Sequence, residues 1–222
     1  MEKKWIHAPS ACGTEIRCRL VRQEGGGSRS LAVLFPGRGY SCDMPVLYYA
    51  GKSAMEAGYD LLNLEYGYQA ARREPKSFEE MTAAASADCA EVLRPLLERY
   101  DRLAFIGKSI GTVVSGLTLE ALKEEGKEKE IRHLFLTPLA QTIPFMLQYG
   151  GLAVAGTNDP AFGPEELRRI EAAEGIELLQ PEGADHALET GEAGQSLDML
   201  RMVLAGMESW LRRGAAGSGE RA

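Results

Sequence analysis

The sequence has no excess of positive charge, since 25 Lys and Arg residues stand against 32 Asp and Glu residues. The net charge of −7 argues against a nucleic-acid partner, because no basic surface is available to displace counterions from phosphates. Cysteines are few as well. Four are present, at no metal-ligand spacing and with no C-x-x-C pair: Cys12, Cys18, Cys42 and Cys89. We interpret them as free thiols in a reducing compartment and expect no metal site.

Long hydrophobic runs are also missing. Residues 1–7 lack the apolar core of a secretory signal peptide, which favours a cytoplasmic protein. The stretch 134–158 carries no charge, but Pro138, Pro144 and paired glycines interrupt it, so no apolar run of about 18 residues remains to cross a membrane. We therefore expect this stretch to be buried or to line a pocket, and we expect no membrane partner.

The composition suits a folded domain. Apolar residues make up 45% of the chain and charged residues 26%, which is enough for a sizeable core and unlike a disordered protein. The length predicts a single domain over residues 1–213. Residues 214–222 are small and polar, so we expect them to form a disordered tail. A homo-oligomer is compatible with the sequence.

Short apolar runs alternate with amphipathic segments along the chain. Residues 15–22 and 31–35, separated by a glycine-rich turn, predict a hairpin leading into a central strand. The remaining pattern predicts strands at 59–64, 103–106, 131–136, 152–155 and 176–179, and helices at 46–57, 77–100 with a break at Pro95, 110–125, 164–173 and 194–211. Strands joined by helical crossovers form a mostly parallel sheet covered by helices on both faces, so the predicted fold class is α/β.

A candidate nucleophile lies between a predicted strand and a predicted helix. Residues 107–111 match the pattern G-x-S-x-G, with Ser109 in the middle. A sharp strand-to-helix turn exposes the central hydroxyl, and flanking glycines remove side chains that would clash there. The backbone N–H of Ile110, at the start of the helix, can donate to an anionic oxygen. Such short patterns also arise by chance, and it is the place between strand and helix that favours the functional interpretation.

A serine nucleophile needs a base, which is normally an imidazole. The chain has three histidines. His7 precedes the predicted sheet, and His133 lies within a predicted strand. His186 instead lies in a turn-rich loop directly after the strand 176–179, so we expect it at the carboxyl edge of the sheet.

The base in turn needs a carboxylate on a loop at the same edge. Asp159 follows the predicted strand 152–155 and is the leading candidate, although an Asp before Pro160 also suits a simple turn. Asp185 is a poorer candidate, because neighbouring side chains in an extended loop tend to point apart. We expect Asp185 to bind loop backbone instead.

The order of Ser109, Asp159 and His186 resembles the nucleophile, acid and base order of the α/β-hydrolase superfamily. The resemblance covers nearly the whole chain. Within the superfamily, the chain is similar to small serine hydrolases without a cap, of the dienelactone-hydrolase and esterase type. It implies an eight-stranded sheet, with Ser109 as nucleophile, Asp159 as acid and His186 as base. No cap domain is expected, because only residues 137–151 separate two predicted strands. The resemblance implies no cofactor.

Members of this superfamily form a second oxyanion donor in the loop after the third strand. Here that loop is residues 35–40, where Pro36 replaces the usual histidine. By position the donor is the N–H of Arg38, with Gly39 as an alternative. A plain glycine-rich turn is the other interpretation.

Apolar and aromatic residues near the expected site are candidates for a substrate pocket: Tyr40, Tyr66, Ile143, Phe145 and Met146. Core packing is the alternative for the last three. Lys108 and Arg38 are two cations near the expected cleft. Either one would favour an anionic substrate if it reaches the cleft, whereas a surface salt bridge is the commoner role of such a residue.

Together these residues predict a serine hydrolase, similar to a carboxylesterase or thioesterase, which cleaves a small acyl ester or thioester through an acyl-enzyme. Transfer of the acyl group to an acceptor other than water would use the same residues. The alternatives are a non-catalytic protein that binds a ligand on the same scaffold, and a peptidase.

Overall fold

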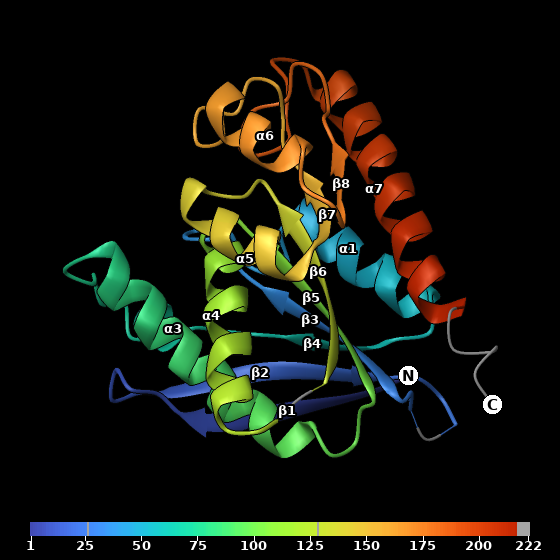
Figure 1. The fold of residues 1–222 in the computed structure, drawn as a ribbon. Helices are drawn as coiled ribbons and strands as arrows, with labels where there is room; N and C mark the ends of the chain where they lie inside the picture. Colours follow the sequence, from blue (N-terminus) through green and yellow to red (C-terminus); the bar gives the residue numbers. More distant parts are fainter. Residues whose placement is uncertain (26, 128, 217–222) are drawn as a thin grey trace.

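A computed structural model describes residues 1–25, 27–127 and 129–216, and its centre is one eight-stranded sheet flanked by helices (Figure 1). The strand order is β1-β2-β4-β3-β5-β6-β7-β8. Strands β3 to β8 run parallel to one another, whereas β1 and β2 pair antiparallel. The predicted α/β class, with a mostly parallel sheet of eight strands, is therefore confirmed.

The elements lie close to the predicted positions. The strands are β1 (Glu2–Pro9), β2 (Glu15–Arg22), β3 (Ser30–Phe35), β4 (Asp60–Asn63), β5 (Arg102–Lys108), β6 (Glu130–Leu136), β7 (Gly151–Val154) and β8 (Ile176–Leu179). The helices are α1 (Pro45–Glu56), α2 (Gly67–Ala70), α3 (Phe78–Leu93), α4 (Ile110–Glu124), α5 (Ile143–Tyr149), α6 (Pro164–Glu171) and α7 (Ala193–Ala216), with the 3-10 turns η1 (Arg94–Leu96) and η2 (Ala140–Thr142).

Two boundaries bear on the sequence predictions. Helix α3 ends just before η1, which contains Pro95, because proline cannot supply the backbone N–H that the next helical turn requires. Helix α7 runs to Ala216 and so enters the range 214–222 that the sequence predicts to be a disordered tail. Residues 217–222 lie outside the described residues.

The hairpin predicted between residues 15–22 and 31–35 is not present, and β2 forms a hairpin with β1 instead. Strand β2 pairs antiparallel with β1 on one side and with β4 on the other, while β3 lies between β4 and β5 and is parallel to both. Residues 15–22 and 31–35 are therefore not hairpin partners. Strand β1 escaped prediction because it lies at the edge of the sheet with mostly exposed side chains, so the alternating apolar pattern of a half-buried strand is missing.

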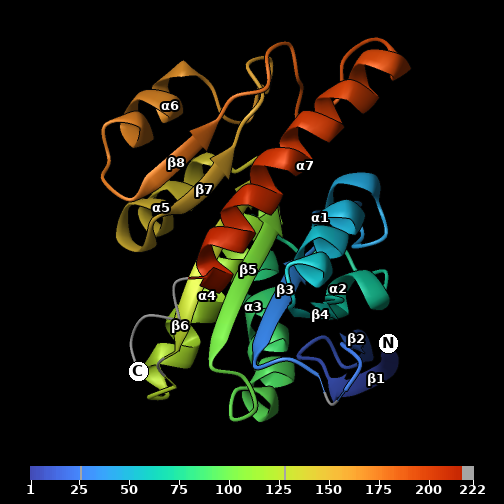
Figure 2. The same ribbon diagram turned by 90° about the vertical axis from the view of Figure 1, so that its right-hand side faces the viewer.

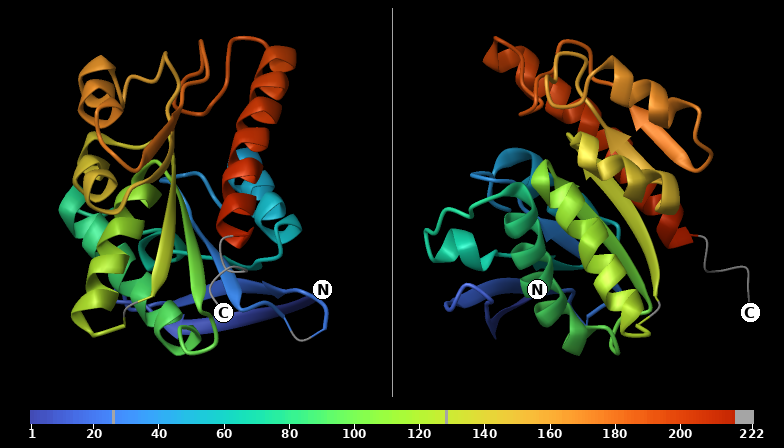
Figure 3. Two further views of the ribbon diagram at one scale, coloured as in Figure 1. Left: turned by 45° about the vertical axis from the view of Figure 1, so that its right-hand side comes forward. Right: turned by 60° about the vertical axis from the view of Figure 1, so that its left-hand side comes forward.

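Helices cover both faces of the sheet, and alternate residues of β5 show how. Leu103 and Phe105 belong to the core under α3 and α4, whereas Ala104 and Ile106 belong to the core under α1 and α7. Figure 3 shows these two pairs of helices on opposite sides of the strands. Burial on both faces explains why β3 and the middle of β5 are continuous apolar runs.

The carboxyl ends of parallel strands meet at one edge of a sheet. In this chain the loops after β3, β5, β7 and β8 leave from that edge, and we call them the rim. Helix α7 begins beside the β8 loop and runs back across the sheet next to α1 (Figure 2). The rim therefore brings together residues that are far apart in the sequence.

Candidate active site

Ser109 lies in a strained turn at the rim. It separates the end of β5 from the first residue of α4 and adopts φ 54° and ψ −122°, a conformation that non-glycine residues rarely take. A Cβ at Gly107 would lie 2.5 Å from the carbonyl oxygen of Gly111, so the turn tolerates no side chain there. The Ser109 N–H donates to Leu136 O at 2.9 Å, which fixes the turn against β6. This is the geometry of a nucleophile elbow.

The structure brings the three predicted polar residues into one hydrogen-bonded chain. The Oγ of Ser109 lies 2.8 Å from Nε2 of His186. On the other side of the ring, Nδ1 lies 2.8 Å from Oδ2 and 3.0 Å from Oδ1 of Asp159. A carboxylate only accepts hydrogen bonds, so Nδ1 carries the ring proton and Nε2 is left to accept one from the Ser109 hydroxyl. The side chain of Asp159 is fully buried and that of His186 is 33% exposed.

The loops that carry Asp159 and His186 are joined by backbone hydrogen bonds. Thr157 N–H donates to Pro181 O at 3.1 Å and Asn158 N–H donates to Ala184 O at 2.9 Å. In addition, the Oδ1 of Asp159 accepts from the N–H of Ala161 at 2.8 Å, which orients the carboxylate within its own turn. The two loops therefore hold the ring and its carboxylate partner as one unit.

Asp185 has the backbone role that the sequence favours. Its Oδ1 accepts from the N–H of Ala187 at 2.8 Å and from the N–H of Glu189 at 3.0 Å. It therefore shapes the turn that presents His186, while Asp159 contacts the ring.

Two loops at the rim supply backbone N–H groups beside Ser109. Ile110 is the first residue of α4, so the helix provides no partner for its N–H. In the loop after β3, Gly37 N–H donates to Tyr40 O at 2.9 Å and Tyr40 N–H donates back to Gly37 O at 3.4 Å. The N–H of Arg38, between them, donates to no other backbone group of the described residues. Gly37 packs against the elbow, since a Cβ built on it would lie 3.7 Å from the Cβ of Ser109. The N–H groups of Arg38 and Ile110 therefore remain the candidate oxyanion donors.

Two side chains hold the loop after β3 in place, one from the N-cap of α2 and one from α2 itself. Tyr66 donates its hydroxyl to Pro36 O at 2.9 Å, and Gln69 donates Nε2 to Gly37 O at 2.9 Å. Tyr66 is fully buried, and this burial raises the pKa of its phenol well above the ordinary value. It is therefore a neutral donor that supports the loop.

The two cations singled out in the sequence have different places. The guanidinium of Arg38 is 65% exposed and donates to Glu74 Oε2 at 2.8 Å, a surface ion pair. Lys108 is only 2% exposed, and its ammonium donates to Thr137 Oγ1 at 2.9 Å and to His186 O at 2.8 Å. Lys108 therefore faces the protein interior.

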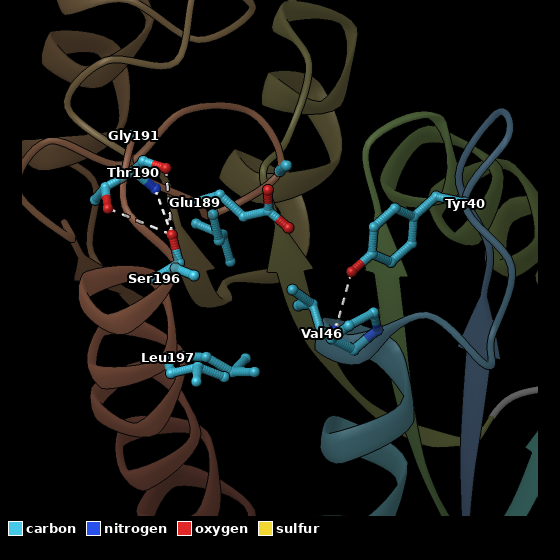
Figure 4. Close-up of a pocket in the computed structure, with 12 residues that line it drawn as sticks. Tyr40, Val46, Glu189, Thr190, Gly191, Ser196 and Leu197 are labelled. Carbon is cyan, nitrogen blue, oxygen red and sulfur yellow. Dashed lines mark hydrogen bonds between the residues drawn. The ribbon is translucent and has the colours of Figure 1, made fainter.

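A hollow of about 460 Å³ lies beside His186, between the start of α1 and the start of α7. We call it the α7 hollow, and its lining residues are Tyr40, Pro45, Val46, Ala187, Leu188, Glu189, Thr190, Gly191, Ala193, Ser196, Leu197 and Leu200. Figure 4 shows the Tyr40 hydroxyl accepting from Val46 N–H on one side and Ser196 of α7 bonded to Thr190 on the other. Leu197 is 67% exposed at its mouth.

A second hollow, of about 490 Å³, is lined by the loop after β3 together with residues 68–74 around and after α2. We call it the arginine hollow, and its lining residues are Arg38, Gly39, Tyr40, Ser41, Met44, Tyr68, Gln69, Arg72, Arg73 and Glu74. Tyr40 lines both hollows, and neither hollow is lined by Ser109 or His186 themselves. Three arginines face one glutamate here, which leaves this hollow with positive charge.

Comparisons with known proteins agree on the fold. The chain is similar to a serine hydrolase without a lid from Xanthomonas campestris, with a TM-score of 0.73 and 15% identity over 98% of this chain and 97% of that one. It is also similar to a hyperthermophilic esterase from Pyrobaculum calidifontis, with a TM-score of 0.70 and 15% identity over 97% of this chain and 87% of that one. An α/β serine hydrolase homologue from Coxiella burnetii gives a TM-score of 0.69 and 14% identity, over 93% of this chain and 98% of that one.

The chain has the α/β-hydrolase fold. No protein-family model and no curated protein matches the sequence, so the likeness rests on structure alone. The finer resemblance to dienelactone hydrolases stays a prediction.

This α/β-hydrolase fold carries no lid between β6 and β7. Only η2 and α5 lie there, and they pack on the sheet instead of covering the rim. In the described ranges, no group of three His, Cys, Asp or Glu side chains is arranged to hold a metal ion, and no helix is both long and apolar enough to span a bilayer.

Most of the residues predicted to line the pocket belong to the core of the fold. Ile143 and Met146 are fully buried in the cluster between α5, α6 and the sheet, and Phe145 packs its ring against Gly116 of α4. Tyr66 lies under the loop after β3, as described above. Of the predicted set, Tyr40 lines the hollows. The apolar pattern of α5 is explained by its packing face, which sequence alone does not distinguish from a pocket wall.

Two features of the site escaped the sequence prediction. The α7 hollow is made largely by residues 187–200, whose turn and helix pattern carries no chemical signature. The contact between Lys108 and His186 joins residues 78 positions apart, and a lysine at this position of the elbow gives no sign of the partner it will meet.

Proposed function

We propose that the protein is a serine hydrolase that cleaves small acyl esters or thioesters, with Ser109 as nucleophile, His186 as base and Asp159 as its orienting acid. The observation that carries the proposal is the hydrogen-bonded chain of 2.8 Å from Ser109 Oγ to His186 Nε2 and 2.8 Å from His186 Nδ1 to Asp159 Oδ2. The strained elbow and the esterases among similar structures support it.

In the first half of the reaction, Ser109 Oγ attacks the carbonyl carbon while its proton passes to His186 Nε2. The negative charge that develops on the carbonyl oxygen is stabilised by the N–H groups of Ile110 and Arg38, each contributing about 3 to 4 kcal/mol in such sites. Asp159 stabilises the imidazolium. When the tetrahedral intermediate collapses, His186 gives its proton to the departing alcohol or thiol, and the acyl group remains on Ser109.

In the second half, water takes the place of the leaving group. His186 accepts a proton from the water as its oxygen attacks the acyl carbon, and the same N–H groups hold the second oxyanion. Collapse returns the proton to Ser109 Oγ and releases the carboxylic acid. The residues of the chain account for every proton transferred.

The two hollows, which share Tyr40 of the loop after β3, favour a small substrate with two different ends. The α7 hollow has a mixed lining, in which Val46, Leu197 and Leu200 lie beside Thr190 and Ser196, and it suits an uncharged group with some polar atoms. The arginine hollow suits a carboxylate or phosphate, because Arg38, Arg72 and Arg73 carry more charge than Glu74 neutralises.

The decisive experiment is labelling of the purified protein with a fluorophosphonate probe, read by intact-protein mass. We expect one adduct in the wild type and none in Ser109→Ala, whereas Ser209→Ala, an exposed serine on α7, keeps the adduct. Absence of an adduct in the wild type would favour a ligand-binding protein without catalysis, and an adduct that survives Ser109→Ala would place the nucleophile elsewhere.

Substrate class is tested separately, with esters and thioesters of graded acyl length and with matched neutral and anionic leaving groups. We expect turnover of short acyl chains and a higher kcat/KM for the anionic member of each pair. Equal kcat/KM values for the neutral and the anionic member would contradict a role of the arginine hollow in binding an anionic group. Cleavage of peptides in preference to esters would identify a peptidase, and product formed only with an added alcohol or amine would identify an acyltransferase.

A further inference from the structure

Lys108 is a charged residue buried directly beside the proposed nucleophile. It is the last residue of β5, immediately before Ser109, and is 2% exposed. Its ammonium has three neutral contacts: it donates to Thr137 Oγ1 at 2.9 Å and to His186 O at 2.8 Å, and it lies 4.6 Å from the centre of the Tyr40 ring. A buried lysine normally costs stability, so its presence here calls for a function.

The contact with His186 is its most informative one. In the residues 1–25, 27–127 and 129–216, the main chain of His186 has one recorded hydrogen bond, and its donor is the Lys108 ammonium. The surrounding turn is held by Asp185, but those bonds end on the N–H groups of Ala187 and Glu189. The backbone that carries the imidazole is therefore fixed to β5 through Lys108.

The charges around Lys108 are acidic. Asp159, Asp185 and Glu189 all favour its protonated form, while burial disfavours it more strongly and lowers the pKa of the amine to about 8. The groups in direct contact, Thr137, Tyr40 and the His186 carbonyl, carry no charge at neutral pH. Lys108 is therefore an ammonium at neutral pH and becomes an amine at mildly alkaline pH.

We propose that Lys108 is a positioning residue, whose ammonium holds the His186 main chain so that the imidazole meets the Ser109 hydroxyl. This inference rests on the proposed function. It assigns to the residue next to the nucleophile a second task, which is to anchor the base. Lys108 itself touches no reacting atom.

Loss of the charge weakens this anchor in two ways. A neutral amine donates a weaker hydrogen bond to the carbonyl than an ammonium does, and its attraction to the Tyr40 ring disappears. A small displacement of the imidazole is enough to lower the rate strongly, since a misplacement of about 1 Å can cost roughly 100-fold. Activity should therefore decline above about pH 8 as Lys108 loses its proton.

The first test replaces the charge with a side chain of similar length. For Lys108→Met we expect at least a tenfold lower kcat with a KM within about twofold of the wild type, and no decline of activity specific to the range above pH 8. The unfolding temperature should change little, because removing the cost of burying the ammonium offsets the loss of its two hydrogen bonds. Lys123→Met, which removes another lysine stacked on a tyrosine ring, is the control and should leave kcat unchanged.

A second pair of variants tests the same anchor without altering Lys108. Thr137→Ala removes one of its two acceptors, whereas Thr137→Ser keeps the hydroxyl. We expect Thr137→Ala to shift the alkaline limb of the pH profile and Thr137→Ser to restore it. A merely structural role would instead lower the unfolding temperature of both Lys108→Met and Thr137→Ala together with the amount of active protein.

Hydrogen exchange, read by mass spectrometry at pH 7, gives a readout that does not depend on activity. In Lys108→Met we expect faster exchange in residues 184–190 and unchanged exchange in α3. Unchanged exchange in that loop, or a wild-type kcat in Lys108→Met, would overturn the positioning role while leaving the proposed hydrolase intact. A wild type that neither hydrolyses esters nor reacts with a fluorophosphonate, but whose loop loosens in Lys108→Met, would overturn the hydrolase and keep the anchor.

Discussion

Tyr66 donates its hydroxyl to the carbonyl oxygen of Pro36 at 2.9 Å, which places a buried ring directly beneath the loop that carries the Arg38 N–H. The contact connects the start of α2 with the end of β3. It gives Tyr66 a part in the site, although a different one from the pocket contact that the sequence indicates. The ring supports the backbone from the core side, and the hydroxyl fixes one carbonyl next to Gly37.

Tyr66→Phe should therefore lower kcat without changing the fold. The substitution leaves Pro36 O without its donor, which costs about 1 to 3 kcal/mol of stability and loosens the loop after β3. We expect roughly a tenfold lower kcat, measured with a neutral ester. Tyr59→Phe is the control, because Tyr59 is a buried tyrosine directly before β4, at the amino ends of the parallel strands. An equal loss of kcat in both variants would contradict a specific role of Tyr66.

Asp159→Asn should abolish most of the activity while the chain stays folded. An amide no longer selects the tautomer with the proton on Nδ1, so His186 cannot accept from Ser109, and we expect kcat to fall by about 10³- to 10⁴-fold. Asp185→Asn is the matched control, because an amide oxygen still accepts from Ala187 and Glu189. We expect less than a tenfold loss there. If Asp185→Asn were the more damaging change, the assignment of the acid would be wrong.

Gly111→Ala should damage stability and activity together. A Cβ at this position would overlap the carbonyl oxygens of Phe35 and Pro36, so α4 and the loop after β3 must move apart. Overpacking of this kind costs about 1 to 3 kcal/mol. Gly194→Ala, in the first turn of α7 with no atom within 4 Å of the new Cβ, should be neutral or stabilising. Thermal unfolding and ester hydrolysis of both variants check the difference.

His133 should make the protein less stable in acid. The residue is 1% exposed and stacked on Phe135 and Tyr149, and among the described residues neither ring nitrogen has a hydrogen-bond partner. Burial, with a smaller effect of Lys123, lowers its pKa from 6.5 to about 3. The folded state therefore stays neutral where the unfolded state takes up a proton, so stability falls as the pH drops below about 6.5.

His133→Phe removes this proton uptake and should flatten the pH dependence. With about 1.4 kcal/mol for each pH unit below 6.5, we expect the wild type to lose about 2 kcal/mol more than the variant between pH 7 and pH 5. Urea unfolding at the two pH values measures the difference. Parallel losses in the two proteins would show that His133 does not titrate in this way.

Much of the fold followed from local patterns. Strands β3 and β5 are buried on both faces, so residues 31–35 and 103–106 appear in the sequence as continuous apolar runs, whereas β6 has such a run only at 134–136. The order of these runs along the chain fixes the rim. The elbow could be found because Gly107, Ser109 and Gly111 are required by the same sharp turn. Strand β1 and the partners of β2 could not, since pairing depends on contacts across the sheet that no local pattern encodes.

For the candidate site, the sequence predicted the residues at strand ends but not the side chains that contact the site from the core. Ser109, Asp159 and His186 each follow a strand. Because the carboxyl ends of parallel strands meet at one edge of the sheet, their proximity could be inferred from the sequence. Side chains that act from within the core gave no such signal. A lysine such as Lys108 is usually expected at the surface, and Ile143 and Met146 were expected to line a pocket. All three side chains are instead buried in the protein interior. Which face an element turns inward is decided only by the assembled structure.

The uncovered rim has a consequence for the fate of the acyl group. With only η2 and α5 between β6 and β7, no lid domain covers the rim, and Ser109 remains partly exposed. An enzyme that hands its acyl group to another molecule must keep water out until the acceptor arrives. A surface this open favours the commonest acceptor, so we expect the covalent adduct to be short-lived and to end as a free acid.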